Sequence, residues 1–163
     1  LALVHRHLYE SQDLREIDLA AFMTGLCRLV QDGCGVPARR VQLDVAIPTA
    51  TMTGDRAIPL ALLTTEILTN AFKHAFPENR AGAIGVRLTV GEHGAARLVI
   101  SDNGVGTAQR TETSLPSTMG QTLIGAFTRQ LGGTLTTSGP PGTTVTIDFA
   151  LVPQPVENLA ATA

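Results

Sequence analysis

The sequence predicts a two-layer α/β sandwich, in which helices cover one face of a mixed, mostly antiparallel sheet. Apolar residues recur at helical spacing in three segments, at residues 18–31, 59–75 and 121–131. Alternating apolar residues, which are typical of strands, occupy five more segments, at residues 41–47, 84–90, 97–101, 134–137 and 143–151. The order helix, strand, helix, two strands, helix, two strands places all three helices against one sheet.

The first of these helices follows another helical pattern at residues 1–9. Its apolar residues, from Leu19 onward, recur every three or four positions and therefore form one buried side. Gly33 ends the pattern, and Pro48 ends the alternating strand that comes next. We expect Asp55 to cap the following helix and Pro77 to stop it.

The second half of the chain is divided by glycine and proline. A tight turn around Gly91 and Gly94 is expected to join two strands into an antiparallel hairpin. The stretch 107–118 is polar and has almost no apolar anchor, whereas the turn at 139–142 joins the last two strands. The alanine-rich tail after Pro153 is expected to fray.

Length and composition indicate one globular domain. The chain has 163 residues, of which 44% are hydrophobic and 16% charged, and its net charge of -2 argues against a nucleic-acid partner. No apolar run approaches the roughly 20 residues that cross a bilayer, so we expect a soluble, cytoplasmic domain without direct membrane insertion. The chain begins inside a helical pattern, so we expect a fragment, whose parent protein could be membrane-attached. Its two cysteines, Cys27 and Cys34, have no partners for a zinc site and are expected to be structural thiols.

The helix at 59–75 carries a polar stripe beside its buried one. Glu66, Asn70 and Lys73 stand at positions i, i+4 and i+7, so their side chains point into a common space. Carboxylate and carboxamide oxygens suit Mg²⁺, and an ammonium group suits phosphate. A solvated helix face is the alternative reading of this triplet alone.

Asp102 ends an apolar strand and is followed by Gly104 and Gly106. The glycines allow a sharp turn and a close approach to a ligand, and the carboxylate can accept a hydrogen bond from an exocyclic amine such as that of adenine. A plain turn is the alternative.

Two further features concern glycines at the start of an element. Gly120 opens the helix near 121–131, where unpaired N–H groups favour a phosphate, and the polar residues 107–119 before it are expected to act as a mobile lid. Gly142 precedes the last strand, where Thr143 or Thr144 could place a hydroxyl near the Asp102 carboxylate.

The four elements ExxxNAxKH, DNGVG, a glycine opening a helix that ends in QLGG, and GTTVTIDF resemble the ATP-binding boxes of the GHKL superfamily. This superfamily includes histidine kinases, Hsp90 chaperones, type II topoisomerases and MutL-type repair proteins, and the resemblance covers about residues 57–149. The segments TNAFKHAFP and ALVHRHLYES resemble the HWE-related histidine kinases, in which the second segment lies on the second helix of the dimerisation domain. The resemblance implies the Bergerat-type ATP-binding fold.

The resemblance also implies roles for individual residues. Asn70 would hold Mg²⁺ between the phosphates, and Glu66 would orient the metal's water or act as the base that activates the acceptor histidine. Lys73 and His74 would contact phosphate.

At the other end of the site, Asp102 would recognise the adenine amine. Gly104 and Gly106 would shape the adenine pocket and the hinge of the lid, and Gly120 would donate backbone N–H groups to phosphate. The reaction would be transfer of the γ-phosphoryl group of ATP to a histidine.

The domain layout and partners follow from the same resemblance. Residues 1–16 would be the remnant of a dimerisation helix with its linker, 17–153 the ATPase domain, and 154–163 a flexible tail. The acceptor histidine would lie on a dimerisation domain upstream or in trans, since His5 fits the acceptor less well than the second helix. A response regulator and a second copy of the full-length protein would be partners. The alternatives are a degenerate GHKL module that serves in binding or phosphotransfer, and an anti-sigma-factor serine kinase.

Overall fold

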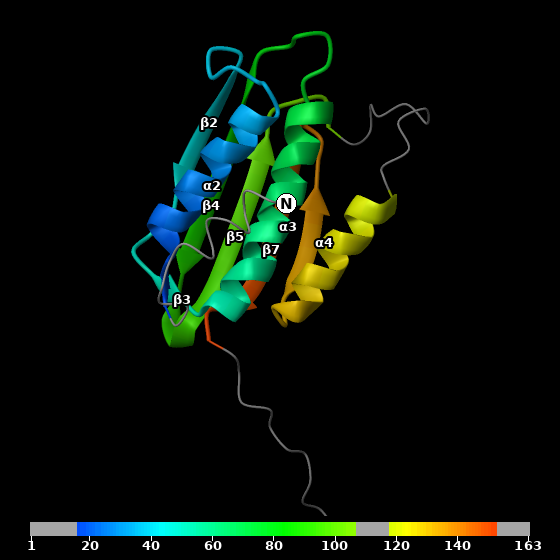
Figure 1. Cartoon of the computed structure of the whole chain (residues 1–163). Helices are drawn as coiled ribbons and strands as arrows, with labels where there is room; N and C mark the ends of the chain where they lie inside the picture. The colour runs from blue at the N-terminus through cyan, green and yellow to red at the C-terminus, as the bar shows by residue number, and fades with distance from the viewer. Residues whose placement is uncertain (1–15, 107–117, 153–163) are drawn as a thin grey trace, which may run out of the picture.

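A five-stranded sheet forms one layer of the protein in a computed structural model that describes residues 16–106 and 118–152 (Figure 1). Its strands are β2 (Val41–Ala46), β4 (Gly82–Val90), β5 (Ala95–Asp102), β6 (Thr134–Ser138) and β7 (Thr143–Ala150). They lie in the order β2-β4-β5-β7-β6. Only the β2/β4 pair is parallel within this sheet, and the other three pairs are antiparallel. The prediction of a mixed, mostly antiparallel sheet is confirmed.

Three described helices cover one face of the sheet, with α3 in the middle (Figure 1). The helices are α2 (Leu19–Gly33), α3 (Gly54–His74) and α4 (Thr118–Gln130). α3 packs against both α2 and α4. The opposite face of the sheet is largely polar, and there the Arg97 guanidinium binds Asp148 at 2.6 Å. The two-layer sandwich that the sequence predicts is therefore confirmed.

The core lies between the helices and the sheet. Leu60 and Leu63 of α3 are fully buried, and the inward positions Ile84, Leu98 and Ile147 of three neighbouring strands are at most 1% exposed. This packing fixes the C-terminal half of α3 above the ends of β5 and β7, where the candidate site lies.

Helix α2 has a side-chain N-cap, but the start of α3 does not. Asp18 Oδ1 accepts hydrogen bonds from the backbone N–H groups of Ala20 and Ala21. The expectation that Asp55 caps α3 is wrong, because the helix begins earlier, after the N-cap residue Thr53. The Thr53 carbonyl accepts the Ala57 N–H at 2.9 Å. Helical hydrogen bonding therefore begins before Pro59, the residue that has no N–H to donate.

The connections show one element that the pattern did not predict. β1 (Ile17–Asp18) and β3 (Thr51–Met52) form a two-residue antiparallel pair, which is too short to give a visible alternation. The hairpin between β4 and β5 is confirmed, and its turn contains the short helix η1 (Glu92–Gly94). His93 in this turn is exposed.

Several expectations lie outside the described residues. These are the helix at 1–9, most of the polar stretch 107–119, and the tail after Pro153. None of the described helices combines the length and apolar character that a bilayer crossing requires.

Candidate functional site

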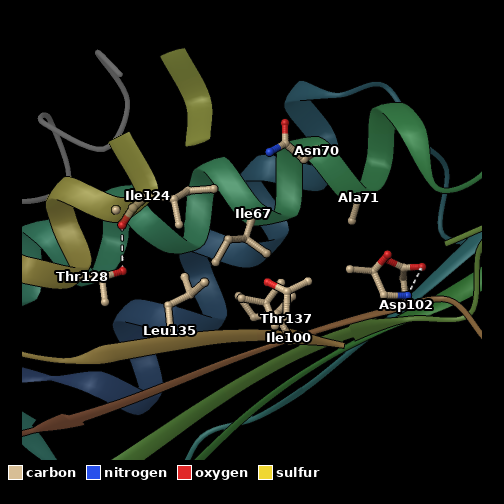
Figure 2. Close-up of a pocket in the computed structure, with 12 residues that line it drawn as sticks. Ile67, Asn70, Ala71, Ile100, Asp102, Ile124, Thr128, Leu135 and Thr137 are labelled. Atoms are coloured by element: carbon tan, nitrogen blue, oxygen red, sulfur yellow. Dashed lines mark hydrogen bonds between the residues drawn. The ribbon is translucent and has the colours of Figure 1, made fainter. Parts of the chain in front are cut away.

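A cavity of about 410 Å³ lies between α3, α4 and the sheet (Figure 2). Most of its walls are apolar, and they come from four elements besides α3. The lining residues that are not discussed individually below are Ala71, Gly125, Leu135, Thr137 and Val145. A concave, mostly apolar pocket with a few polar groups is the usual form of a small-molecule site.

Asp102 is the last residue of β5, and its half-buried carboxylate lines this cavity. Its Oδ1 atom accepts the backbone N–H of Gly104 at 2.9 Å and that of Thr143 at 3.3 Å. Neither bond uses the second oxygen, Oδ2. Two backbone donors from different segments therefore fix the carboxylate while one of its oxygens stays available as an acceptor.

The glycines after Asp102 permit two close approaches between backbone segments. A Cβ atom on Gly104 would collide with the backbone carbonyl oxygen of Ala75, at the end of α3. Gly106 has a positive φ of 72°, and a Cβ there would lie 2.9 Å from the carbonyl oxygen of Gly142. The turn after β5 thus packs directly against α3 on one side and the β6–β7 turn on the other.

Asn103 anchors the same turn to the neighbouring strand. Its Oδ1 atom accepts the backbone N–H of Ala83 at 2.8 Å, and its own backbone N–H donates to the Ala83 carbonyl at 3.2 Å. The Arg80 guanidinium also donates to the Asn103 carbonyl, at 3.3 Å. The position of the Asp102 carboxylate is therefore set by a network of backbone hydrogen bonds.

The polar stripe of α3 meets the cavity at one residue. Asn70 lines the cavity together with Asp102, as the sequence predicts. Glu66 is half-buried, Lys73 and His74 are exposed, and none of the three is a lining residue. Lys73 instead lines a separate groove between α3 and the α2–β2 connection, so the expected common space does not include it.

The two remaining predicted elements need small corrections. α4 begins at Thr118, so Gly120 is the third residue of the helix and does not open it; it is buried within the first turn. Thr143 lines the cavity, whereas Thr144 does not, because successive side chains of a strand point to opposite faces. The contact of Thr143 with Asp102 uses a backbone N–H rather than the expected hydroxyl.

The apolar walls were not predicted as part of a site. Ile67 and Ile100 are core residues that also face the cavity. On α4, Ile124 and Thr128 stand one turn apart, and the Thr128 hydroxyl donates to the Ile124 carbonyl at 2.7 Å (Figure 2). In the sequence, the i, i+4 spacing of Ile124 and Thr128 is the signal that could have identified α4 as the cavity wall opposite α3.

Metal ligands in the described part of the chain are few. Residues 16–106 and 118–152 contain no cluster of three His, Cys, Asp or Glu side chains placed to hold a metal ion. Asn70 and Glu66, one turn apart on α3, are the oxygen donors nearest to this role. Both cysteines are free thiols, and burial raises the pKa of Cys27 to about 12.

Comparison with protein families and known proteins gives a consistent result. The family model described as "Histidine kinase-, DNA gyrase B-, and HSP90-like ATPase" matches residues 55–153. Blue-light-activated histidine kinase 2 of Erythrobacter litoralis is 29% identical over an alignment of 159 residues that covers 90% of this chain and 44% of that protein. The nitrate/nitrite sensor protein NarQ of Escherichia coli is 28% identical over 138 residues, or 83% of this chain and 23% of NarQ.

Solved structures agree with these sequence relatives. The blue-light-activated histidine kinase EL346 of Erythrobacter litoralis is 25% identical with a TM-score of 0.78, over 91% of this chain and 52% of that one. The chain spans about half, or less, of the length of these relatives.

Proposed function

We propose that this chain, which belongs to the histidine kinase-, DNA gyrase B- and HSP90-like ATPase family, is the ATP-binding catalytic domain of a two-component sensor histidine kinase. One observation carries the proposal: Asn70 of α3 and Asp102 of β5 line the same apolar cavity. The similarity to Erythrobacter litoralis blue-light-activated histidine kinases supports placement among HWE-related kinases.

The cavity suits an adenine base. Its apolar walls, including Ile67, Ile100 and Ile124, match the faces of a flat purine ring. Asp102 Oδ2 is the acceptor that the exocyclic amine of adenine requires, because Oδ1 is already held by two backbone N–H groups. We assign adenine recognition to Asp102 and assign the shape of the adenine pocket and the hinge of the lid to Gly104 and Gly106.

The phosphates would lie toward the C-terminal end of α3. Asn70 and Glu66 supply oxygen donors one turn apart, which fits Mg²⁺ because this ion usually takes one or two protein ligands together with substrate phosphates and water. When bound, the ion would neutralise charge on the phosphates. His74, on the exposed side of the same helix end, is assigned to phosphate contact, as are the backbone of Gly120 and the start of β7 at Thr143 and Thr144. Lys73, for which the resemblance implies the same role, lines the separate groove on the other side of α3 and is not assigned to the nucleotide.

The proposed reaction moves the γ-phosphoryl group of ATP to a histidine nitrogen. The bond between the γ-phosphorus and the β,γ-bridging oxygen breaks, a phosphorus–nitrogen bond forms, and ADP leaves. The proton of the acceptor imidazole passes to a base, a role that we assign to Glu66. Positioning and charge neutralisation provide most of the catalysis in reactions of this kind.

The partners follow from the proposed reaction. The acceptor histidine would lie on a dimerisation domain, upstream or in trans, and a response regulator would receive the phosphoryl group. We propose that residues 1–16 belong to the dimerisation helix and linker, 17–153 to the ATPase domain, and 154–163 to a tail. The full-length protein would act as a homodimer.

Two measurements test the proposal. A titration with a fluorescent ATP analogue, with and without Mg²⁺, should show saturable binding. Incubation of the chain with radiolabelled ATP and the histidine-bearing dimerisation domain should then label that domain with an acid-labile, alkali-stable phosphate. An acid-stable phosphoserine would indicate a serine kinase, and absence of nucleotide binding would indicate a degenerate module; either result contradicts the proposal.

A further inference from the structure

A second hollow, of about 670 Å³, lies on the side of α3 away from the cavity and is lined by positive charge. Arg39 and Arg40 come from the connection before β2, and Lys73 comes from the end of α3. No aspartate or glutamate is among the lining residues. We call this hollow, defined by Arg39, Arg40 and Lys73, the basic groove.

The cations of the basic groove lack carboxylate partners in the described part of the chain. The salt bridge that the described residues form, between Arg97 and Asp148, lies on the face of the sheet that the helices leave uncovered. Arg40 donates to the neutral Asn79 side chain, Nη1 to Oδ1, at 3.4 Å. Because the whole chain carries a net charge of -2, this local excess of positive charge is not a reflection of overall composition.

The loop beside the basic groove is held in an unusual conformation. Glu78 and Asn79, between α3 and β4, have positive φ angles of 55° and 59°. Such angles are costly for residues other than glycine, less so for asparagine, and they persist only where the surrounding structure holds them. The Arg40–Asn79 contact is one of the interactions that hold this loop against the groove.

The basic groove is separate from the cavity that contains Asp102. α3 contributes Ile67, Asn70 and Ala71 to the cavity but Phe72 and Lys73 to the groove, and no residue lines both. Since successive helix residues are rotated by about 100°, these sets face different sides of α3. A nucleotide bound at Asp102 would therefore leave the groove accessible.

We propose that the basic groove is a docking surface for an acidic protein partner, one that presents several carboxylates. Its Arg39 and Lys73 side chains are exposed and come from separate elements, an arrangement that suits charges spread over a protein surface. A single small anion is bound best by donors that converge on one point, whereas these cations are spread over two elements. This inference goes beyond the proposed kinase function, because it does not depend on nucleotide binding.

The test uses the isotopically labelled chain and hexaglutamate as a model of a carboxylate-rich surface. We expect hexaglutamate to shift the backbone amide resonances of residues 34–40 and 72–81, with an affinity that falls as salt is added. Arg39→Gln/Arg40→Gln should weaken binding about two- to thirtyfold, given that exposed ion pairs each contribute about 0.2–1 kcal/mol. The control Arg28→Gln/Arg87→Gln also removes two positive charges, but from exposed positions outside the groove. It should bind hexaglutamate with the affinity of the unaltered chain.

Three results would overturn the docking proposal. The first is equal weakening by both double variants, since binding would then follow net charge alone. The second is tighter binding of inorganic phosphate than of hexaglutamate at the same amides, which would indicate a small-anion site. The third is competition between hexaglutamate and an ATP analogue, which would make the groove part of the nucleotide site. If Arg40→Gln disturbs the Asn79 loop, the single variant Arg39→Gln serves for the same comparison. Loss of nucleotide binding alone would contradict the kinase proposal and leave this one standing.

Discussion

Replacing Asp102 by asparagine should separate recognition of adenine from stability of the fold. In the protein, one carboxylate oxygen accepts the backbone N–H groups of Gly104 and Thr143. An asparagine side chain retains one oxygen for these two donors. Its second terminal atom is an NH₂ group, however, which would face the adenine amine with a donor instead of an acceptor.

The expected loss of affinity has two parts. A hydrogen bond to a charged acceptor contributes about 1.5–3 kcal/mol, and an opposed, unpaired donor adds about 1 kcal/mol or more. The sum, about 3 kcal/mol, corresponds to roughly a hundredfold weaker binding. Asp102→Ala should lose affinity similarly but also remove the acceptor for both backbone donors. Leaving the two N–H groups without an acceptor should lower the free energy of unfolding by about 2 kcal/mol, which lowers Tm by roughly 4–8 °C in a domain of this size.

The assay is a titration of each variant with a fluorescent ATP analogue, paired with thermal unfolding in the absence of nucleotide. Asp102→Asn should unfold within about 2 °C of the unaltered chain, while Asp102→Ala unfolds earlier. If Asp102→Asn binds the analogue within about twofold of the unaltered chain, the assignment of Asp102 to adenine recognition is refuted. If Asp102→Ala keeps its Tm, the anchoring role of the two backbone N–H groups is wrong.

Three further outcomes are expected. Asn70→Asp should make nucleotide binding depend more strongly on Mg²⁺, because the added carboxylate binds the cation but repels bare phosphates. The ratio of the affinity with Mg²⁺ to the affinity without it should rise roughly tenfold, and an unchanged ratio in the titration would count against the Asn70 assignment. Gly104→Ala should destabilise the protein by about 1–3 kcal/mol in chemical denaturation, because its Cβ would collide with the Ala75 backbone. Gly25→Ala, in open space on α2, is the matched control and should stabilise by about 0.5–1 kcal/mol. Burial raises the pKa of Cys27 from 9.0 to about 12, so the folded state keeps the thiol proton that the unfolded chain loses above pH 9. The free energy of unfolding should thus be about 1.4 kcal/mol lower at pH 10 than at pH 7 on account of this thiol, and Cys27→Ala should remove that part of the decline.

The periodic elements of this fold were predictable because each has one buried side. The α3 positions Leu60, Leu63, Ile67 and Ala71 follow a helical period in the sequence and are all buried in the structure. The sequence pattern places the start of α3 at Pro59, which is wrong, because the helix begins at Gly54, directly after the N-cap residue Thr53. Proline near a helix start removes one hydrogen bond but need not mark the first residue.

The site was predictable where it depends on local chemistry. Asp102 at a strand end and Asn70 on a helical stripe were identified from their neighbours in sequence, and they line one cavity. The backbone contact of Thr143 with Asp102 depends on the pairing of β5 with β7, which joins residues 41 positions apart. The location of Lys73 depends on how α2 packs against α3. Such long-range contacts leave no local pattern in the sequence.

Helix α3 divides its circumference among three tasks, and this division explains why substitutions on it should have separable effects. Leu63 faces the core and is fully buried, so truncating it would cost stability before any effect on ligands could be seen. Asn70 faces the cavity, and Lys73 faces the basic groove on the other side of the helix. The helix is held between α2 and α4, so the spacing between these sites is rigid on the scale of a side chain. A partner docked in the groove and a nucleotide in the cavity would therefore be held at a fixed relative position, on opposite sides of one helix.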